Sequence, residues 1–239
     1  KENIFIVGAG PSGVELACKL SDLYSHNFNI QIIEKSQEIL NNNKVFNREE
    51  AEKAIKKKNI NVFLNTNVDE IREDEIDIIH DIDKKTTLKH HAVIWTAGVK
   101  PNLPIFKEDL TRLFGKVLIN ENLQIKEFKN AFALGDIAII ENKEYLPSTA
   151  QVAMQQGKHA ANNLNLLINQ KELLPFEFKD NGEMISLGLG EASISALGIT
   201  LSGKFAFEVR RLIYASKMPM IEKTFKSAAS WLIDKKSIF

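Results

Sequence analysis

The sequence has little of several features that mark particular classes of protein. Among 239 residues there is one cysteine, Cys18, so neither an internal disulfide nor a CxxC redox pair can form within the chain. No apolar run reaches the ~18 residues of a membrane-spanning helix, and no secretory leader is recognisable. Lysine plus arginine and aspartate plus glutamate balance at 31 each. We therefore expect no transmembrane helix and no nucleic-acid partner, and the histidines have no ligand spacing that predicts a metal site.

This balance of charge is uneven along the chain. The stretch 198–239 contains eight basic and three acidic residues, so it carries a net charge of +5 and residues 1–197 carry −5. Two amphipathic helices, about 206–217 and 220–233, are predicted there on either side of Pro219. Basic amphipathic helices of this kind favour an anionic membrane surface. The same pattern is also typical of helices that pack on their own core, which is the alternative.

A glycine turn at the start of the chain is its most informative motif. A β-branched run, 4–7, leads into Gly8-Ala9-Gly10-Pro11-Ser12-Gly13, and apolar residues follow at helical spacing. In such a GxGxxG turn, Gly8 permits the tight turn, Gly10 admits a pyrophosphate, and Gly13 lets the helix pack on the strand. We expect the diphosphate at the helix start, beside Pro11 and Ser12. Glu34 ends the next predicted strand, 21 residues after Gly13, as a ribose-binding carboxylate does.

Residues 1–98 have the pattern of an α/β unit that binds a dinucleotide. A helix is predicted over 47–58, and the strands expected after it are 60–64, 68–72, 75–80, 86–89 and 92–96. Charged turns separate the middle three, which indicates an inserted antiparallel meander. Beyond this unit we expect short strands at 116–120, 123–125 and 131–134, a helix from Pro147 to about 169, and a hairpin of 176–178 with 184–189.

Three further motifs follow in order along the chain. Thr96-Ala97-Gly98 comes after a predicted buried strand, and Gly135-Asp136 comes after another. The run 147–157 contains Ala150, Gln151 and Gln155, with the two glutamines four residues apart. That spacing puts both amides on one helix face, about 6 Å from each other. Taken together, these motifs match the AQxAxQ signature and the glycine motifs of type II NADH:quinone dehydrogenases, a family that this sequence resembles over nearly its whole length.

The resemblance implies a fold and a set of binding residues. The fold is the two-dinucleotide-binding-domain flavoprotein fold, of class α/β, with its N-terminal FAD segment missing from this sequence. The implied division is an NAD(P)H-binding domain at 1–100, the C-terminal part of an FAD-binding domain at 101–170, and a hairpin with membrane-associating helices at 171–239. The resemblance assigns Glu15 and Thr96, Ala97 and Gly98 to the nicotinamide, Gly135, Asp136, Ala150 and Gln151 to FAD, and Gln151 and Gln155 to quinone.

The implied activity is the transfer of a hydride from NAD(P)H to FAD and of two electrons to a membrane quinone, without proton pumping. The flavin carries the chemistry, so no catalytic side chain is expected. NADH is the expected donor because Glu34 would face a 2′-phosphate, with NADPH left open. Segments 202–206 and 210–219 are similar to the cyanobacterial and plastid branch of demethylphylloquinone reductases. That branch suggests a peripheral protein of electron transport on the cytoplasmic side of a thylakoid or plasma membrane, with a homodimer as one assembly.

Other classes share parts of this pattern. A soluble ferredoxin or rubredoxin reductase has a similar fold but does not require the glutamine pair or the basic tail. A disulfide reductase needs a pair of cysteines that this chain does not have. A nucleotide-binding fragment without flavin is the non-enzymatic alternative.

Overall fold

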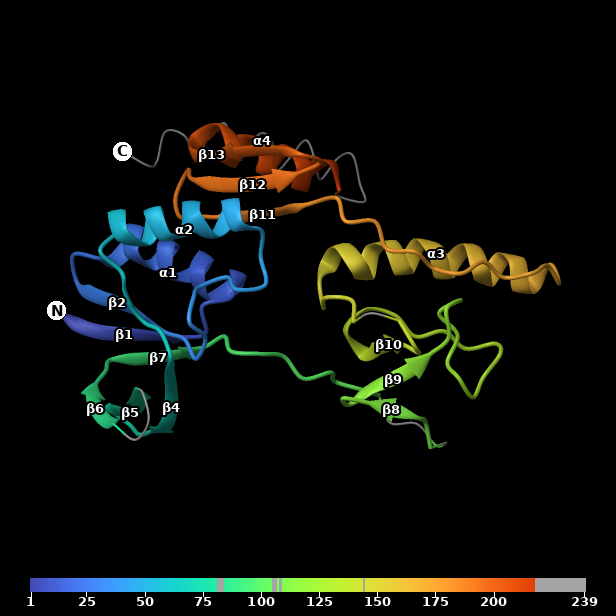
Figure 1. The fold of residues 1–239 in the computed structure, drawn as a ribbon, viewed down its shortest axis with the longest axis horizontal. Helices are drawn as coiled ribbons and strands as arrows, with labels where there is room; N and C mark the ends of the chain where they lie inside the picture. The colour runs from blue at the N-terminus through green and yellow to red at the C-terminus, as the bar shows by residue number, and fades with distance from the viewer. Residues whose placement is uncertain (81–83, 105–106, 108, 144, 218–239) are drawn as a thin grey trace. The chain divides into compact units, whose positions relative to one another are not determined.

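The computed structural model describes residues 1–80, 84–104, 107, 109–143 and 145–217, which form two compact units (Figure 1). One unit consists of the described residues of 1–98 together with 181–217, and the other of the described residues of 99–180. Each contact described below joins two residues of the same unit.

The first unit is built on a parallel sheet with the strand order β3-β2-β1-β7. Its elements in chain order are β1 (Glu2–Val7), α1 (Pro11–Tyr24), β2 (Phe28–Ile33), α2 (Val45–Lys57), β3 (Asn61–Phe63) and β7 (Ala92–Trp95). Val7 pairs with Ile33 on one side and with Trp95 on the other. The carboxyl ends of three strands therefore meet at one edge, which is where open α/β sheets bind ligands.

Alternating side chains of this sheet enter two apolar cores. Ile4 and Ile6 of β1 pack with Val14, Ala17 and the buried Cys18 of α1. Their neighbours Phe5 and Val7 pack on the opposite face against the meander β4 (Thr66–Ile71), β5 (Glu75–His80) and β6 (Lys84–Lys89). In Figure 1 the helices cover one face of the sheet and the meander covers the other. Burial on both faces explains why these strands are continuous apolar runs.

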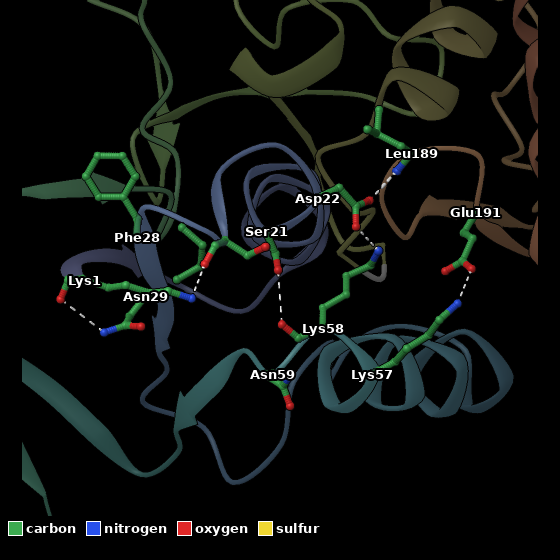
Figure 2. Close-up of a pocket in the computed structure, with 12 residues that line it drawn as sticks. Lys1, Ser21, Asp22, Phe28, Asn29, Lys57, Lys58, Asn59, Leu189 and Glu191 are labelled. Carbon is green, nitrogen blue, oxygen red and sulfur yellow. Dashed lines mark hydrogen bonds and ion pairs between the residues drawn. The ribbon is translucent and has the colours of Figure 1, made fainter. Parts of the chain in front are cut away.

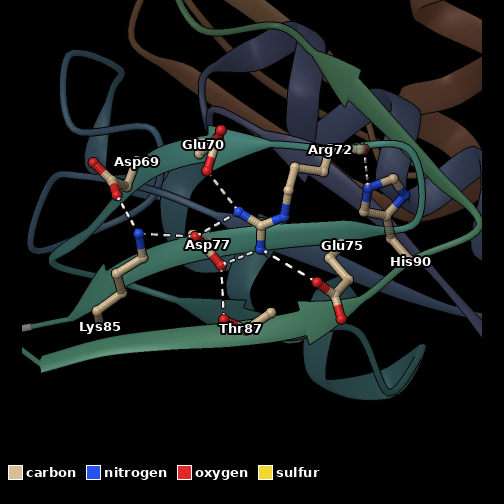
Figure 3. A network of polar contacts seen from close by, with 8 residues as sticks. All are labelled: Asp69, Glu70, Arg72, Glu75, Asp77, Lys85, Thr87 and His90. Atoms are coloured by element: carbon tan, nitrogen blue, oxygen red, sulfur yellow. Dashed lines mark hydrogen bonds and ion pairs between the residues drawn. The ribbon is translucent and has the colours of Figure 1, made fainter.

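The meander carries a polar network on the side away from the apolar core (Figure 3). Asp77, whose side chain is 4% exposed, accepts two hydrogen bonds from Arg72, at 2.7 and 2.8 Å. It also accepts one from the Thr87 hydroxyl at 2.7 Å and pairs with Lys85 at 2.9 Å. Arg72, followed by Lys85 and Thr87, holds the pKa of Asp77 well below its usual range. This network ties three consecutive strands together on their outer face.

A C-terminal module belongs to the same unit. It contains β11 (Glu183–Ser186), β12 (Ala192–Ala196), β13 (Ile199–Ser202) and α4 (Gly203–Ser216). The Asp22 carboxylate of α1 accepts a hydrogen bond from the Leu189 N–H at 2.6 Å and pairs with Lys58, as Figure 2 shows. Lys57 pairs with Glu191 at 2.6 Å, and both residues line a cavity of about 610 Å³. Asp22 and Glu191 therefore link this module to α1 and α2.

The second unit contains a small sheet and one long helix. Its elements are β8 (Arg112–Leu113), β9 (Lys116–Ile119), the 3-10 helix η1 (Gly135–Ile137), β10 (Ala138–Ile140) and α3 (Ala150–Ile168), and the strand order is β10-β9-β8. Val117, Ile119 and Leu123 lie in its core with Phe176. No helix in the described part of the chain is long and apolar enough to cross a membrane.

The structure corrects four details of the predicted elements. The hairpin of 176–178 with 184–189 is wrong: β11 pairs with β12, and Phe176 is buried in the other unit. β12 and β13 were not predicted, because the sequence around them is rich in alanine and serine rather than in residues that favour strands. Segments 123–125 and 131–134 form only isolated bridges. The helix begins at Ala150 rather than Pro147, because the Thr149 side chain accepts a hydrogen bond from the Val152 N–H at 3.3 Å.

The two helices predicted near the C-terminus have different outcomes. The first corresponds to α4, which starts three residues earlier, at Gly203. The second, 220–233, lies outside the described residues.

Candidate functional site

The glycine turn after β1 has the geometry that its sequence predicts. Gly8 adopts φ +103°, a conformation that side chains disfavour. A Cβ added to Gly13 would lie 1.9 Å from the Gly8 carbonyl oxygen, so strand and helix touch backbone to backbone here. A Cβ added to Gly10 would meet nothing within 4 Å. The turn is therefore tight at Gly8 and Gly13, and open at Gly10.

Hydrogen bonds hold this turn from three sides. The Thr96 hydroxyl lies within 2.9 Å of the Val7 carbonyl oxygen and 3.2 Å of the Gly8 carbonyl oxygen. The Gly8 N–H donates to the Ile33 carbonyl at 2.8 Å. The Ala9 carbonyl accepts from the Leu40 N–H at 2.9 Å. Thr96 thus positions the glycine turn, and its contact with a nicotinamide stays a prediction.

Glu34 reaches the same turn from the end of β2. One carboxylate oxygen accepts a hydrogen bond from the Ala9 N–H at 2.6 Å, and the other accepts from the Ser36 N–H at 2.9 Å. Partial burial raises the pKa of this carboxyl, but the hydrogen bonds from Ala9 and Ser36 outweigh burial and leave the pKa below its usual value. A carboxylate has about four acceptor positions, so these bonds do not exhaust its capacity to accept from the hydroxyls of a ribose.

A cavity of about 500 Å³ opens beside the turn. Six predicted binding residues line it: Gly8, Gly10, Glu34, Thr96, Ala97 and Gly98. None of the other lining residues is among the predicted binding residues. They come from the ends of β1, β2 and β7, the loop after Glu34 and the start of β4: Val7, Ile33, Lys35, Ser36, Asn41, Asn42, Thr66, Asn67, Val68 and Trp95.

The start of α1 points unpaired donors at the turn. Pro11 occupies its first position, and the first intrahelical bond runs from the Val14 N–H to the Gly10 carbonyl at 3.0 Å. The N–H groups of Ser12 and Gly13 precede that bond, so they have no acceptor within the helix. Together with the helix dipole they favour an anion at this end.

Glu15, predicted beside the nicotinamide, makes contacts that the sequence did not indicate. One of its carboxylate oxygens accepts a hydrogen bond from the Ser186 N–H at 2.8 Å. The same oxygen pairs with Arg210 of α4 at 3.3 Å. Glu15 therefore links α1 to the C-terminal module, and its role toward a nicotinamide stays a prediction.

The predicted flavin and quinone residues lie in the second unit. Gly135 adopts φ +70° and opens η1, where Asp136 is exposed. A Cβ on Gly135 would lie 3.4 Å from Ala153 of α3, so the Gly-Asp pair lies against this helix. Ala150 and Gln151 form the first turn of α3. The Gln155 amide exchanges hydrogen bonds with the Lys179 backbone, at 2.8 Å from Nε2 to the carbonyl and 3.1 Å from the N–H to Oε1.

Two residues of this unit were missed by the sequence interpretation. Gln156, 3% exposed, accepts a hydrogen bond from the Gly135 N–H at 2.7 Å and so fixes the Gly-Asp turn on α3. Lys116, 7% exposed, donates to the Ser148 hydroxyl at 2.9 Å and lies over the Tyr145 ring at 4.9 Å. Lys116, and after it Ser148, lowers the pKa of Tyr145. Neither residue stands out in sequence, because a buried lysine or glutamine has no periodic signature.

Comparison with known proteins identifies the class of this fold. Residues 1–157 match the family described as pyridine nucleotide-disulphide oxidoreductase. A glycine turn, a parallel sheet and an inserted meander define a dinucleotide-binding α/β protein. The chain belongs to the pyridine nucleotide-disulphide oxidoreductase family.

Individual relatives resemble the chain over nearly its whole length. The chain is 36% identical to demethylphylloquinone reductase NdbB of Synechocystis, over 97% of its own length and 58% of the relative's. It is 32% identical to the alternative NAD(P)H-ubiquinone oxidoreductase C1 of Arabidopsis thaliana, over 95% of this chain and 48% of that one. The chain thus spans about half the length of these relatives. The fold matches NDH2 from Plasmodium falciparum in complex with NADH, with a TM-score of 0.82 at 15% identity, over 98% of this chain and 65% of that one.

Proposed function

We propose that the whole protein is an NAD(P)H:quinone oxidoreductase that works with FAD. The single observation that carries the proposal is the cavity at the glycine turn, where Gly8, Gly10, Glu34 and the end of β7 meet. The names of its relatives, a demethylphylloquinone reductase and an NAD(P)H-ubiquinone oxidoreductase, support quinone as the acceptor.

The residues present fit a dinucleotide. The open space at Gly10 would receive the pyrophosphate, and the N–H groups of Ser12 and Gly13 would donate to its oxygens. The ionised Glu34 would accept from the ribose hydroxyls. A 2′-phosphate at the same place would meet this negative charge, which favours NADH, while the adjacent Lys35 weakens the discrimination.

The second unit fits part of a flavin site. Asp136 is exposed and carries a carboxylate for hydroxyl groups, and the N-terminus of α3 at Ala150 and Gln151 favours an electron-rich edge. When bound, FAD would supply the hydride and two-electron chemistry. Gln156 holds the turn before Asp136, and the Lys179 backbone pairs with both polar atoms of the Gln155 amide. Gln156 and Lys179 thus keep the Gly135 turn and the Gln155 amide in fixed positions.

We place the protein at the periphery of a membrane, on the cytoplasmic side of a thylakoid or plasma membrane. Support comes from α4, where Phe205 and Leu212 are 68% and 66% exposed, and from the net positive charge of the stretch 198–239. A homodimer is a further proposal.

The test measures quinone reduction by the protein at its full natural length. NADH should be oxidised in step with reduction of a soluble naphthoquinone, and NADH should bleach the bound flavin. Gln151→Ala should slow quinone reduction more than it weakens NADH binding. An enzyme that reduces a ferredoxin but no quinone would refute the proposal in favour of the soluble reductase class.

A further inference from the structure

Trp95 has an unusual setting at the end of β7. Its side chain is large and mostly apolar, yet the residue is 58% exposed. Its one polar atom, Nε1, donates to the carbonyl of Ala97 at 3.0 Å, so the indole is held by its own strand end. The ring is therefore fixed in place while much of its surface stays exposed, so a flat ring of a ligand could stack on it.

The open surface of Trp95 belongs to the dinucleotide cavity. Trp95 lines this cavity together with Glu34, Thr66 and Val68. In β7 the residue two positions earlier, Val93, packs toward the meander, so alternation places the indole on that same side of the sheet. Val68, at the start of the meander, also packs toward this core. The indole thus forms the wall of the cavity on its meander side.

The distance from Glu34 to Trp95 suits one nucleoside. Val7 of β1 pairs with both Ile33 and Trp95, so β2 and β7 lie two strand spacings apart, or roughly 10 Å. Glu34 directly follows Ile33. Glu34, Thr66 and Trp95 line one cavity, so a base on the ribose carbon next to the hydroxyls that Glu34 would hold has room along this wall.

We propose that Trp95 is the stacking platform for the adenine ring of the dinucleotide, and so contributes to affinity through the adenosine half. Because the indole Nε1 donates to the Ala97 carbonyl, this end of β7 then lies beside the adenine, in place of the nicotinamide contact that the resemblance implies for Ala97. This inference rests on the proposed dinucleotide site and adds a residue to it. Stacking on an indole tolerates any flat base, since every base has a π-face. Trp95 therefore strengthens binding of the adenosine half by stacking, while Glu34 accepts hydrogen bonds from the ribose hydroxyls.

The experiment uses ligands that carry one half of the dinucleotide. ADP-ribose contains the adenine, ribose and pyrophosphate, whereas reduced nicotinamide mononucleotide contains only the other ring. The 239-residue sequence contains two tryptophans, so in that chain Trp231→Phe gives a background in which fluorescence reports Trp95. ADP-ribose should quench that signal as it binds. Isothermal titration then gives dissociation constants for Trp95→Leu and Trp95→Phe.

We expect Trp95→Leu to weaken ADP-ribose binding about tenfold, and Trp95→Phe to weaken it less, because a smaller aromatic ring still stacks. Binding of the nicotinamide mononucleotide should not change. Phe114→Leu is the matched control, since Phe114 is an exposed aromatic (79%) that does not line this cavity, and it should bind ADP-ribose as the wild type does. Thermal unfolding checks that the exposed Trp95 variants stay folded.

The outcomes separate this inference from the proposed function. Trp95→Leu binding ADP-ribose with wild-type affinity, while Glu34→Ala binds weakly, overturns the role of Trp95 and leaves the site intact. Weakened binding of only the nicotinamide mononucleotide overturns it too, because the ring would then stack at the other end. Wild-type chain that binds neither ADP-ribose nor NADH refutes the dinucleotide site and this inference together.

Discussion

Replacing the glycines of the turn one at a time separates what the turn does for the fold from what it does for a ligand. In Gly13→Ala, the new Cβ would lie 1.9 Å from the Gly8 carbonyl oxygen and 2.9 Å from the Thr96 hydroxyl oxygen. A carbon needs about 3.5 Å from such an atom. Strand and helix must therefore separate by more than an ångström, which opens the contact between β1 and α1.

Gly10→Ala is the opposite case. Gly10 has φ −70° and ψ −178°, which alanine adopts without strain, and its added Cβ would meet nothing within 4 Å. The methyl group enters only the space that we assign to the pyrophosphate. Gly157→Ala, in the interior of α3, also meets nothing within 4 Å and serves as the control.

The three variants should differ in two measurements, thermal unfolding and NADH titration of the full chain. Gly13→Ala should lower the free energy of unfolding by about 1–3 kcal/mol, as overpacking does, and abolish NADH binding. Gly10→Ala should keep wild-type stability and weaken NADH at least tenfold. Gly157→Ala should bind normally and gain about 0.5–1 kcal/mol, since alanine is the better helix former. Wild-type NADH affinity in Gly10→Ala would refute our placement of the pyrophosphate.

Other predictions follow from single contacts. Thr96→Val removes the hydroxyl that holds the glycine turn and should cost about 1 kcal/mol of unfolding free energy, with weaker NADH binding in titration; unchanged values would show that the hydroxyl is dispensable. Glu34→Gln should narrow any preference for NADH over NADPH, and equal affinities for both in the wild type would contradict our view of this carboxylate. Asp77→Asn should lower the melting temperature more than Asp69→Asn, because Asp77 is the buried centre of the meander network. Since the folded pKa of Asp77 lies below its ordinary 3.8, its stabilisation is full above that pH and should fade as pH falls further.

The sequence predicted the parts of the fold where local patterns and burial agree. The parallel strands of the first unit appear within a few residues of their expected bounds, because both faces of their sheet are buried. The meander was predictable from the charged turns that separate its strands. The glycine turn and Glu34 were predictable because backbone geometry dictates residue type at Gly8 and Gly13.

Contacts between distant segments were not predictable. Asp180-Asn181-Gly182 has the composition of a hairpin turn, but the chain passes there from one unit to the other. The link of Glu15 to Ser186 spans 171 residues, and the bond from Gly135 to Gln156 spans 21. Side chains that serve such long-range bonds leave no periodic signal, so Lys116, Gln156 and Trp95 emerged only from the structure.

The central claim is that NADH binds at the glycine turn, and amide hydrogen exchange of the full chain with and without NADH tests it most directly. We predict that NADH protects peptides covering 8–13 and 34–36, where Ser12, Gly13 and Glu34 would hold the pyrophosphate and ribose. Binding of NADH without added protection in these two segments would contradict the account.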